Sequence, residues 1–260
     1  MDNAHLYIVS KIIVLEYKVS LNLPLTNNNM AKLILIRHGQ SIWNAANKFT
    51  GWVDVPLSKL GRLEATKAAY KLREYRVDVC FTSLLIRAIE TAIICLTEFE
   101  EICAGRNPVL KHEADDPHWH GWDKYEGDSS CELPIIPSMA LDERFYGDLQ
   151  GLNKAQTAEK YGADVVQAWR RSFSMRPPGG ESLEDTMQRT LPFFHSRILT
   201  QLKSGDNVLV AAHGNSLRSI IIELDRLSPE LIPNLELATG VPIIYDVDDT
   251  GQATNKIILN

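Results

Sequence analysis

The sequence is poor in cysteine, has only a small excess of negative charge and lacks any long uninterrupted apolar run. Its four cysteines, Cys80, Cys95, Cys103 and Cys131, form no CxxC pair and are too few for a disulfide framework in 260 residues. We therefore predict reduced thiols and a cytoplasmic location. The net charge of −6 argues against nucleic acid as the main partner, because binding to a phosphate backbone normally requires a basic face.

Residues 1–29 differ in character from the rest of the chain. This stretch is apolar, but Lys11, Glu16 and Lys18 interrupt it, which excludes a membrane span. It also lacks the continuous apolar segment and the small-residue cleavage site of a secretory signal, so we predict no membrane partner. The polar stretch TNNN before Met30 is typical of a linker. We expect a dispensable extension; an added edge strand and an organellar targeting segment are the alternatives.

Apolar runs alternate with helical patterns from residue 33 onward, which is typical of an α/β protein. The runs that we expect to form strands are 33–36, 77–83, 207–212, 241–247 and 255–260. The stretches with apolar residues at helical spacing are 65–72, 85–96 and 217–224. The sequence therefore predicts a single α/β domain over residues 30–260, with a mostly parallel central sheet and helices on both faces.

Two further helices have recognisable first residues. Asn153 can cap a short helix, and Ser182 has the capping-box spacing to Asp185. The second helix should continue to about residue 203. Pro192 lies inside it, so we expect a kink or a break there.

Residues 105–140 are rich in Pro, Gly, Asp, His and Trp, and we expect no regular element there. A long inserted loop in a compact domain is more often functional than idle. The side chains in it that are able to bind a metal are His112, Asp115, Asp116, His118, His120 and Cys131. Their spacing fits no recognised ligand pattern, so we predict a solvated loop and no metal site.

Two of the expected strands end in the same chemistry. KLILIRHGQS contains His38, and NVLVAAHGNS contains His213. Ligands of open parallel sheets bind beyond the carboxyl ends of the strands, so both histidines would face one crevice if their strands are neighbours. The glycine after each histidine lets the backbone approach a ligand closely. A single histidine at a strand end is more often structural, so only the pair indicates a function.

Several basic residues and one acid accompany the histidines. They are Arg37, Arg87, Glu143, Arg144, Lys154, Arg170 and Arg171. Taken singly, such side chains are usually solvated surface, and Arg170 with Arg171 fits the polar side of a helix that buries Trp169. Together they indicate a phosphorylated substrate, because a guanidinium group matches phosphate oxygens two at a time. Such a set suffices for phosphoryl transfer without a metal.

Five ordered blocks carry a more specific resemblance. They are LILIRHGQSIWNAANKFTGWVDVPLSKLG, TSLLIRAIET, LDERFYGDLQGLNKAQTAEKYG, AWRRSF, and AAHGNSLRSIIIELD with TGVPIIYD. Through them the chain resembles the cofactor-dependent phosphoglycerate mutases, a branch of the histidine phosphatase superfamily, over nearly everything from Met30 onward. The resemblance implies the fold of that family and an isomerase of glycolysis and gluconeogenesis that interconverts 3-phosphoglycerate and 2-phosphoglycerate. It also implies a phosphohistidine intermediate primed by 2,3-bisphosphoglycerate, with no metal.

The resemblance implies roles for individual positions. His38 matches the histidine that takes up the phosphoryl group, Glu143 matches the proton donor and acceptor, and His213 matches a residue that steadies the phosphoryl group in the transition state. The other positions around that phosphoryl group are Arg37, Asn44 and Arg87. The positions that match the substrate and carboxylate pocket are Ser41, Thr50, Gly51, Arg144, Tyr146, Lys154, Arg170, Arg171, Gly214 and Asn215.

Two features depart from the commonest pattern of the family. The insert before Leu141 is unusual there, and the sequence stops at Asn260 where relatives often continue into a mobile tail that covers the site. We expect the insert to take over this covering role, with Trp119, Trp122 and Tyr125 as an apolar lid.

Two other functions stay open on sequence alone. One is a phosphatase of the same superfamily, in which water accepts the phosphoryl group; the other is a non-catalytic protein that binds a phosphorylated ligand. The blocks FTGW, ERFYG and GLNKA favour the mutase over the phosphatase. A nucleophile paired with an acid argues against a pure binding protein. The sequence leaves the oligomeric state open, a homo-oligomer included.

Overall fold

The computed structural model describes residues 30–112, 127–228, 231–232 and 235–260. The extension at 1–29 lies outside the described residues, and so do the three aromatic residues expected to form a lid, Trp119, Trp122 and Tyr125. The statements below concern the described part of the chain.

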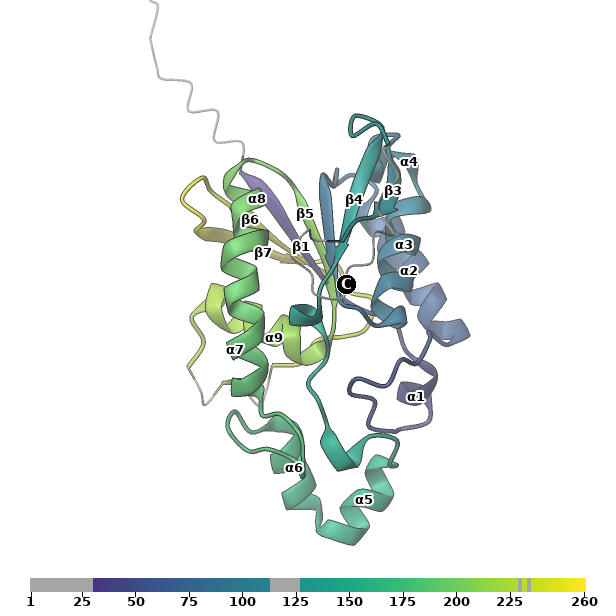
Figure 1. The fold of residues 1–260 in the computed structure, drawn as a ribbon, viewed down its shortest axis with the longest axis vertical. Coiled ribbons are helices and arrows are strands. Elements are labelled where there is room, and N and C mark those ends of the chain that lie inside the picture. Colours follow the sequence, from purple (N-terminus) through teal and green to yellow (C-terminus); the bar gives the residue numbers. More distant parts are fainter. Residues whose placement is uncertain (1–29, 113–126, 229–230, 233–234) are drawn as a thin grey trace, which may run out of the picture.

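The centre of the fold is a seven-stranded sheet with the order β3-β4-β2-β5-β1-β6-β7 (Figure 1). Its strands are β1 Ala31–Arg37, β2 Val79–Thr82, β3 Asn107–Leu110, β4 Glu132–Pro137, β5 Val208–Ala212, β6 Pro242–Val247 and β7 Ala253–Ile258. The five strands from β3 to β1 run parallel, whereas β6 pairs antiparallel with β1, and β7 pairs antiparallel with β6 at the edge of the sheet. The prediction of a mostly parallel sheet is confirmed.

Helices cover both faces of the sheet, as predicted (Figure 1). Strand β1 shows why: Leu33 and Leu35 face one layer of apolar side chains, and Ile34 and Ile36 face the other. The first layer involves α7, η3, α8 and α9, and the second involves α2, α3 and α4. These helices are α2 Lys59–Leu72, α3 Ile86–Thr97, α4 Glu100–Cys103, α7 Leu183–Phe193, η3 Phe194–Ile198, α8 Leu199–Lys203 and α9 Gly214–Asp225.

The helix expected from Ser182 is present and begins with the predicted capping box to Asp185. Pro192 does not break it into separate pieces. Instead, α7 continues directly into the π-helical segment η3 and then into α8. Proline has no backbone N–H, so the helix lacks one hydrogen bond at Pro192, and the residues that follow form a π-helical segment. The hydroxyl of Ser196 donates to the Pro192 carbonyl at 2.7 Å, which satisfies one of the groups at this irregularity.

The expectation that residues 105–140 contain no regular element is wrong for two stretches. Strands β3 and β4 both lie in this range and extend the parallel sheet from β2. Their sequences, NPVL and ELPIIP, contain prolines, which weaken the strand signal because proline cannot donate to a sheet ladder. The hydrogen bonds of β4 to β2 and of β3 to β4 form these strands in spite of their prolines.

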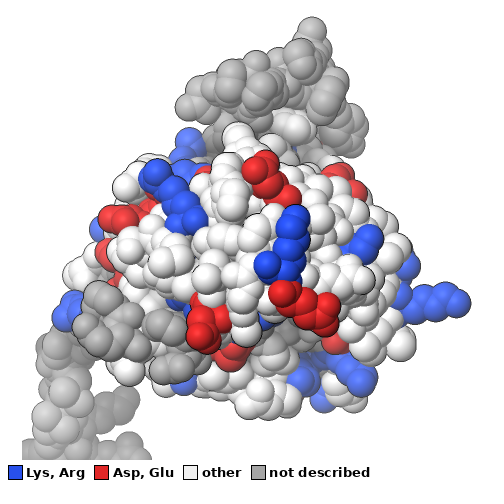
Figure 2. Space-filling model, turned by 90° about the horizontal axis from the view of Figure 1, so that it is seen from below, with Lys and Arg blue, Asp and Glu red and all other residues white. Residues whose placement is uncertain are grey.

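A smaller lobe lies beyond the carboxyl edge of the sheet, at the bottom of Figure 1. It consists of α1 Ile42–Ala45, η2 Gly147–Leu149, α5 Lys154–Tyr161 and α6 Ala163–Arg171. The short helix η1 Met139–Leu141 packs instead against α7 and α9 of the main domain. Asn153 caps α5, as predicted, with its side chain accepting from two backbone N–H groups. The lobe has its own small core of Phe49, Leu149 and Val166. On the face seen in Figure 2, basic and acidic side chains are interspersed and no broad basic patch is visible.

Candidate active site

His38 lies where β1 ends, and its side chain is only 2% exposed. Its Nδ1 is 2.7 Å from the carbonyl oxygen of Gly39. A carbonyl oxygen can only accept, so Nδ1 carries the ring proton and Nε2 presents a lone pair. Burial, followed by the charges of Arg87 and Arg37, holds the pKa of His38 well below its usual value. The ring is therefore a neutral nucleophile at neutral pH.

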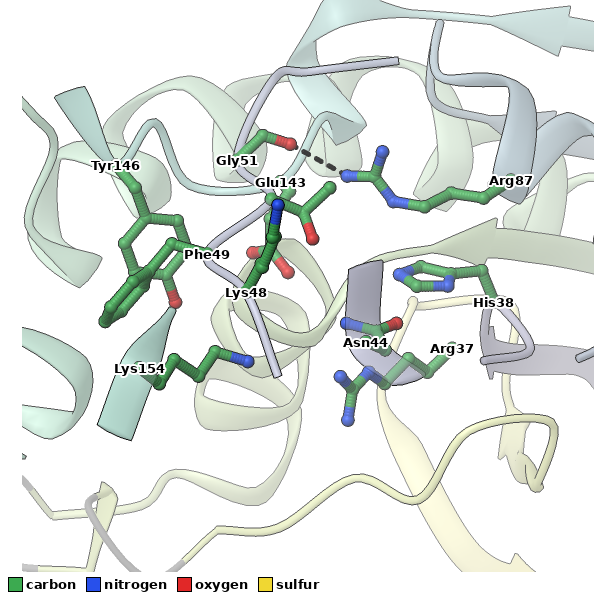
Figure 3. A pocket seen from close by; sticks show the side chains of 11 residues that line it. Arg37, His38, Asn44, Lys48, Phe49, Gly51, Arg87, Glu143, Tyr146 and Lys154 are labelled. Atoms are coloured by element: carbon green, nitrogen blue, oxygen red, sulfur yellow. Dashed lines mark hydrogen bonds between the residues drawn. The ribbon is translucent and has the colours of Figure 1, made fainter. Parts of the chain in front are cut away.

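Two arginines place fixed positive charge beside this ring. Arg87 donates to the carbonyl of Gly51 at 2.8 Å, and Arg37 donates to the carbonyl of Leu237 at 2.8 Å. The Nε of each is buried and has no hydrogen-bond partner in the described part of the chain. Burial lowers the pKa of Arg87 to about 10, which leaves it charged at neutral pH. In the view of Figure 3 the two arginines lie on opposite sides of His38.

Asn44 is oriented by the cap of its own short helix. Its Oδ1 accepts from the backbone N–H of Ser41 at 3.1 Å, and the Ser41 hydroxyl accepts from the backbone N–H of Asn44 at 3.0 Å. Because Oδ1 is occupied in this way, the amide presents Nδ2 as the donor to the pocket that it lines together with His38.

His213 comes from the strand next to His38. Strand β5 pairs in parallel with β1, and the two imidazole centroids are 4.9 Å apart with 60° between the ring planes. Burial, followed by the charge of Arg87, holds the pKa of His213 well below its usual value, so this ring is also neutral. The two strands are neighbours and the two rings lie next to each other, as the sequence suggested, but His213 is fully buried and does not itself line the pocket that His38 lines.

Glu143 is the carboxylate of the site and it is ionised. Its Oε1 accepts from the backbone N–H of Arg144 at 2.8 Å, and from the backbone and side chain of Asn215 at 3.1 and 2.8 Å. Burial raises the pKa of Glu143, but these hydrogen bonds and the charges of Arg37 and Arg87 outweigh burial and lower it to about 2. The group is therefore a proton acceptor in the unliganded protein.

Apart from His213, which lies behind the wall, these residues line two adjoining pockets. The first, which we call the inner pocket, is lined by Arg37, His38, Asn44, Lys48, Phe49, Thr50, Gly51, Arg87, Glu143, Tyr146 and Lys154 (Figure 3). The outer pocket is lined by Arg37, Glu143, Tyr146, Lys154, Arg170, Arg171, Gly214, Asn215, Arg218 and Glu236. Arg37, Glu143, Tyr146 and Lys154 line both, so a ligand with two anionic groups can bridge them.

The geometry agrees with the comparison to known protein families. The family model of the histidine phosphatase superfamily (branch 1) matches residues 33–126 and 125–258. The chain belongs to the histidine phosphatase superfamily.

Within the superfamily, the chain is similar to curated phosphoglycerate mutases. It is 68% identical over 233 residues to the 2,3-bisphosphoglycerate-dependent phosphoglycerate mutase of Gloeothece citriformis, a match over 89% of this chain and 100% of that protein. It is 67% identical over 230 residues to 2,3-bisphosphoglycerate-dependent phosphoglycerate mutase 1 of Gloeobacter violaceus, over 88% and 99% of the two chains. The resemblance found in the sequence is confirmed.

Several solved structures share the fold at lower identity. Mycobacterial hydrolase 1 matches with a TM-score of 0.66 and 23% identity, over 86% of this chain and 95% of that chain. A mycobacterial glucosyl-3-phosphoglycerate phosphatase matches with a TM-score of 0.65 and 23% identity, over 86% and 96%. At this identity the likeness concerns the fold alone.

Most site residues expected from the superfamily resemblance line the inner or the outer pocket. Those that do not are Ser41, Arg144 and His213, which are all 0% exposed. Arg144 donates to the Tyr146 hydroxyl at 3.3 Å and to the Arg170 carbonyl at 3.1 Å. The structure thus places Arg144 behind the pocket wall, where it supports residues that line the wall.

The structure gives a separate reason for the glycine after His38. A Cβ at Gly39 would lie 2.2 Å from the carbonyl oxygen of Gly61, so Gly39 is needed for close contact with the start of α2. Gly214 lines the outer pocket. A Cβ there would meet Arg218, Arg37 and Glu143 at 3.7 to 3.8 Å, among the residues that line the outer pocket.

Sequence reasoning missed four lining residues: Lys48, Phe49, Arg218 and Glu236. Arg218 lies one helical turn after Gly214, so helix periodicity offered a signal for it. Its Nη1 donates to Asn215 Oδ1 at 3.3 Å, which turns the amide nitrogen of Asn215 toward Glu143. Glu236 forms an ion pair with Arg171, and no local sequence pattern indicates that Glu236 lies at the pocket.

Arg189 of α7 is a further residue that the sequence did not reveal. It donates to the carbonyl oxygens of Met139, Ala140, Asp142 and Glu143 at 2.9 to 3.1 Å. These bonds hold the backbone that carries the Glu143 carboxylate. A single arginine in a predicted helix is usually surface, so periodicity gave no reason to select it.

The metal and membrane predictions are tested only in part. Within the described ranges, no group of three or more potential ligands could hold a metal ion. Asp115, Asp116, His118 and His120 lie outside the described residues. Among the helices of the described segments, none combines the length and the apolar character needed to cross a membrane.

Proposed function

We propose that the protein interconverts 3-phosphoglycerate and 2-phosphoglycerate through a phosphohistidine at Nε2 of His38, primed by 2,3-bisphosphoglycerate. The observation that carries the proposal is a neutral imidazole with its Nε2 lone pair available, beside the fixed guanidinium groups of Arg37 and Arg87 and the ionised Glu143. The 68% identity to a mutase that depends on the same bisphosphate supports the same reaction.

In the proposed cycle, phosphorylated His38 gives its phosphoryl group to the 2-hydroxyl of 3-phosphoglycerate. The new O–P bond forms as the N–P bond breaks, and Glu143 takes the hydroxyl proton. His38 then attacks the phosphorus at the 3-position of the bound bisphosphate. As that O–P bond breaks, Glu143 returns the proton to the leaving oxygen, which yields 2-phosphoglycerate and restores the phosphohistidine.

The inner pocket suits this transfer because its donors surround the place where charge develops. A phosphoryl transition state spreads negative charge over three equatorial oxygens. Arg37 and Arg87 are held by backbone carbonyls, and Asn44 presents its amide nitrogen. Donors that are fixed before the reaction stabilise the transition state without reorganisation. We propose that these cationic side chains make a metal unnecessary.

The pKa of Glu143 must rise when substrate binds for the proton to shuttle efficiently. At about 2, the unliganded group is a weak base. The charges of Arg37 and Arg87 contribute to that low value, and a bound phosphoryl group offsets both of them. Binding therefore moves the pKa of Glu143 toward the operating pH, where general acid and base catalysis is most effective.

We propose that the outer pocket binds the anionic group that does not react. Its cations are Lys154, Arg170, Arg171 and Arg218, joined by Arg37 where the two pockets meet. Asn215 adds an amide whose orientation is set by Arg218. The distance between the pockets then decides which substrate oxygen faces His38, because the outer anion fixes the other end of the molecule.

Phosphorus NMR of product formation tests the proposal. The protein is incubated with 3-phosphoglycerate, with and without 2,3-bisphosphoglycerate. We expect 2-phosphoglycerate to appear, with the initial rate strongly increased by the primer. Inorganic phosphate as the main product would instead identify the phosphatase alternative, and the absence of either product would favour a binding protein.

We further propose that residues 30–260 form the catalytic unit and that residues 1–29 are dispensable. A protein beginning at Met30 should keep the turnover and the Tm of the full chain, whereas a large drop in Tm would show that the extension packs on the domain. A cytoplasmic location is part of the proposal. The four cysteines Cys80, Cys95, Cys103 and Cys131 are all free, as expected in a reducing compartment.

A further inference from the structure

Ser83 follows β2 directly and makes a contact that the proposed mechanism does not use. Its Oγ lies 2.7 Å from Nε2 of His213 and 3.2 Å from the backbone nitrogen of Leu85, and the side chain is fully buried. Nδ1 of His213 is also buried, but it has no hydrogen-bond partner in the described ranges. One ring nitrogen is therefore held by the protein, and the other is left for something else.

The bonds at Ser83 indicate where the proton of His213 lies. The Leu85 N–H can only donate, so Ser83 Oγ accepts from it. The single hydroxyl hydrogen then needs an acceptor, and its partner among the described residues is Nε2 of His213. If Nε2 carried the ring proton, Oγ would receive two donors and its own hydrogen would be buried without an acceptor, which is costly.

We propose that Ser83 is a positioning residue that selects the tautomer of His213 with its proton on Nδ1. The inference rests on the proposed function, in which His213 steadies the transferred phosphoryl group. Because the two imidazole centroids are 4.9 Å apart, a phosphoryl group on His38 lies next to the His213 ring. In the selected tautomer Nδ1 offers a proton to the phosphoryl oxygens. In the opposite tautomer a lone pair would face them and repel them.

The neutral state of His213 makes this choice necessary. Burial and neighbouring positive charge hold the pKa of the ring well below its usual value, so at neutral pH the ring has one proton to place. Arg87, His38, Arg37 and Arg189 are the charged and titratable groups that contribute to this lowering. Each of them disfavours a second proton on the ring. The contact that distinguishes the two ring nitrogens is the hydrogen bond between the Ser83 hydroxyl and Nε2.

A purely structural role for Ser83 is the competing explanation, because its bond to Leu85 also supports the start of α3. Thr82 provides the matched control. It is the preceding residue, it is equally buried, and its Oγ1 donates to the Ala211 carbonyl at 2.9 Å. Thr82→Val removes one buried hydroxyl bond from the adjacent position, at the end of β2, without changing a bond to His213. Ser83→Ala removes the hydroxyl that bonds to the ring.

Nitrogen NMR of the full chain with ¹⁵N-labelled histidine tests the tautomer without substrate. Signals of His213 are assigned by their loss in His213→Gln. In the wild-type protein we expect a protonated, pyrrole-type Nδ1 and a pyridine-type Nε2. Ser83→Ala should move the ring toward protonated Nε2 or a mixture, and Thr82→Val should leave it unchanged. A proton on Nε2 in the wild type, or no change in Ser83→Ala, overturns the proposal.

Kinetics test the consequence. Ser83→Ala should lower kcat by about 10²-fold, comparable to the loss of one transition-state donor, with KM changed much less. Ser83→Thr keeps the hydroxyl and should recover both the tautomer and most of kcat. If kcat falls in both Ser83→Ala and Thr82→Val, and falls in proportion to the decrease in Tm of each variant, the role of Ser83 is structural and the proposal is contradicted. The NMR result does not depend on turnover, so a wild-type protein without mutase activity would refute the proposed function separately.

Discussion

The inner and outer pockets are adjacent, but they are built in different ways. The inner pocket takes His38 from the end of β1 and Arg87 from α3, which packs on the central sheet, and these two residues are 2% and 1% exposed. The outer pocket takes Arg170 and Arg171 from α6, in a small lobe with its own core. These two arginines are partly exposed. One pocket is rigid because it is deeply packed, and the other lies at the surface.

The arginines of the two pockets also differ in their hydrogen-bond partners. Arg37 and Arg87 bond to backbone carbonyls, which no ligand displaces. Arg171 instead pairs with the side chain of Glu236, which is 65% exposed and can be replaced by an anionic group of the substrate. Phosphoryl transfer requires fixed alignment, whereas recognition of an anion tolerates exchange of partners. Substitutions in the inner pocket should therefore lower kcat, and those in the outer pocket should raise KM.

The largest effect is expected from removing the nucleophile. His38→Ala should lower turnover by about 10⁶-fold and abolish the acid-labile label obtained from labelled bisphosphoglycerate. His195→Ala serves as the control, because His195 is about half exposed (47%) and lies outside both pockets. Wild-type labelling of His38→Ala would show that another residue carries the phosphoryl group.

The next largest effect is expected at the proton shuttle. Glu143→Gln keeps the shape of the side chain but removes the base, so turnover should fall by about 10² to 10⁴-fold. Phosphorylation of His38 by the primer should be retained better than turnover. Equal loss of both activities, or no loss of either, would contradict the assigned role. Rapid quenching with labelled primer measures the first activity, and product analysis measures the second.

A change in the outer pocket should separate binding from chemistry. Arg171→Ala should raise KM for 3-phosphoglycerate about 10-fold or more, because one charge-assisted hydrogen bond is lost, while kcat changes little. Glu236→Gln should have the opposite and smaller effect. It removes the carboxylate that competes for Arg171 and should lower KM. A fall in kcat with unchanged KM in Arg171→Ala would remove the distinction between the two pockets.

The smallest effect concerns stability and pH. His38 and His213 have lowered pKa values in the folded protein, whereas both protonate near pH 6.5 in the unfolded chain. Above pH 6.5 their stabilising contribution is fully present. Below it the unfolded chain binds protons that the folded protein does not, so the free energy of unfolding falls by up to about 1.4 kcal/mol per pH unit for each histidine.

Urea titrations between pH 5 and pH 7 should therefore show a shallower dependence on pH for His38→Gln than for the wild type. His195→Gln controls for the loss of a histidine at a half-exposed position. An identical slope in His38→Gln and the wild type would show that burial does not keep the His38 ring neutral.

Features with local signals were predictable from the sequence. The strands that lead to His38 and His213 are continuous apolar runs, and the caps at Asn153 and Ser182 depend on residues two or three positions away. The prediction that the two histidines meet also succeeded, because the ends of parallel strands share one edge of the sheet. Strands β3 and β4 were missed because their prolines weaken the local strand preference.

Features that depend on distant contacts were not predictable. Ser83 and His213 are 130 residues apart, and nothing near either residue reveals that they bond. Arg189 contacts the backbone of Glu143 from 46 positions away, and backbone carbonyls leave no pattern in a sequence. Arg144 matches a position of the substrate pocket in the family, but its side chain lies behind the pocket wall. A matched residue type does not fix the direction of a side chain.

A chase of the phosphorylated protein tests the division between the two pockets most directly. The protein is labelled with radioactive bisphosphoglycerate, freed of excess primer and mixed with unlabelled 3-phosphoglycerate in a rapid-quench experiment. We expect the label to leave His38 and appear in bisphosphoglycerate and 2-phosphoglycerate. In Arg171→Ala the rate should be normal at saturating 3-phosphoglycerate and reduced only below saturation. Label released as inorganic phosphate, or a saturated rate as slow in Arg171→Ala as in Glu143→Gln, would contradict a fixed transfer site served by a separate binding site.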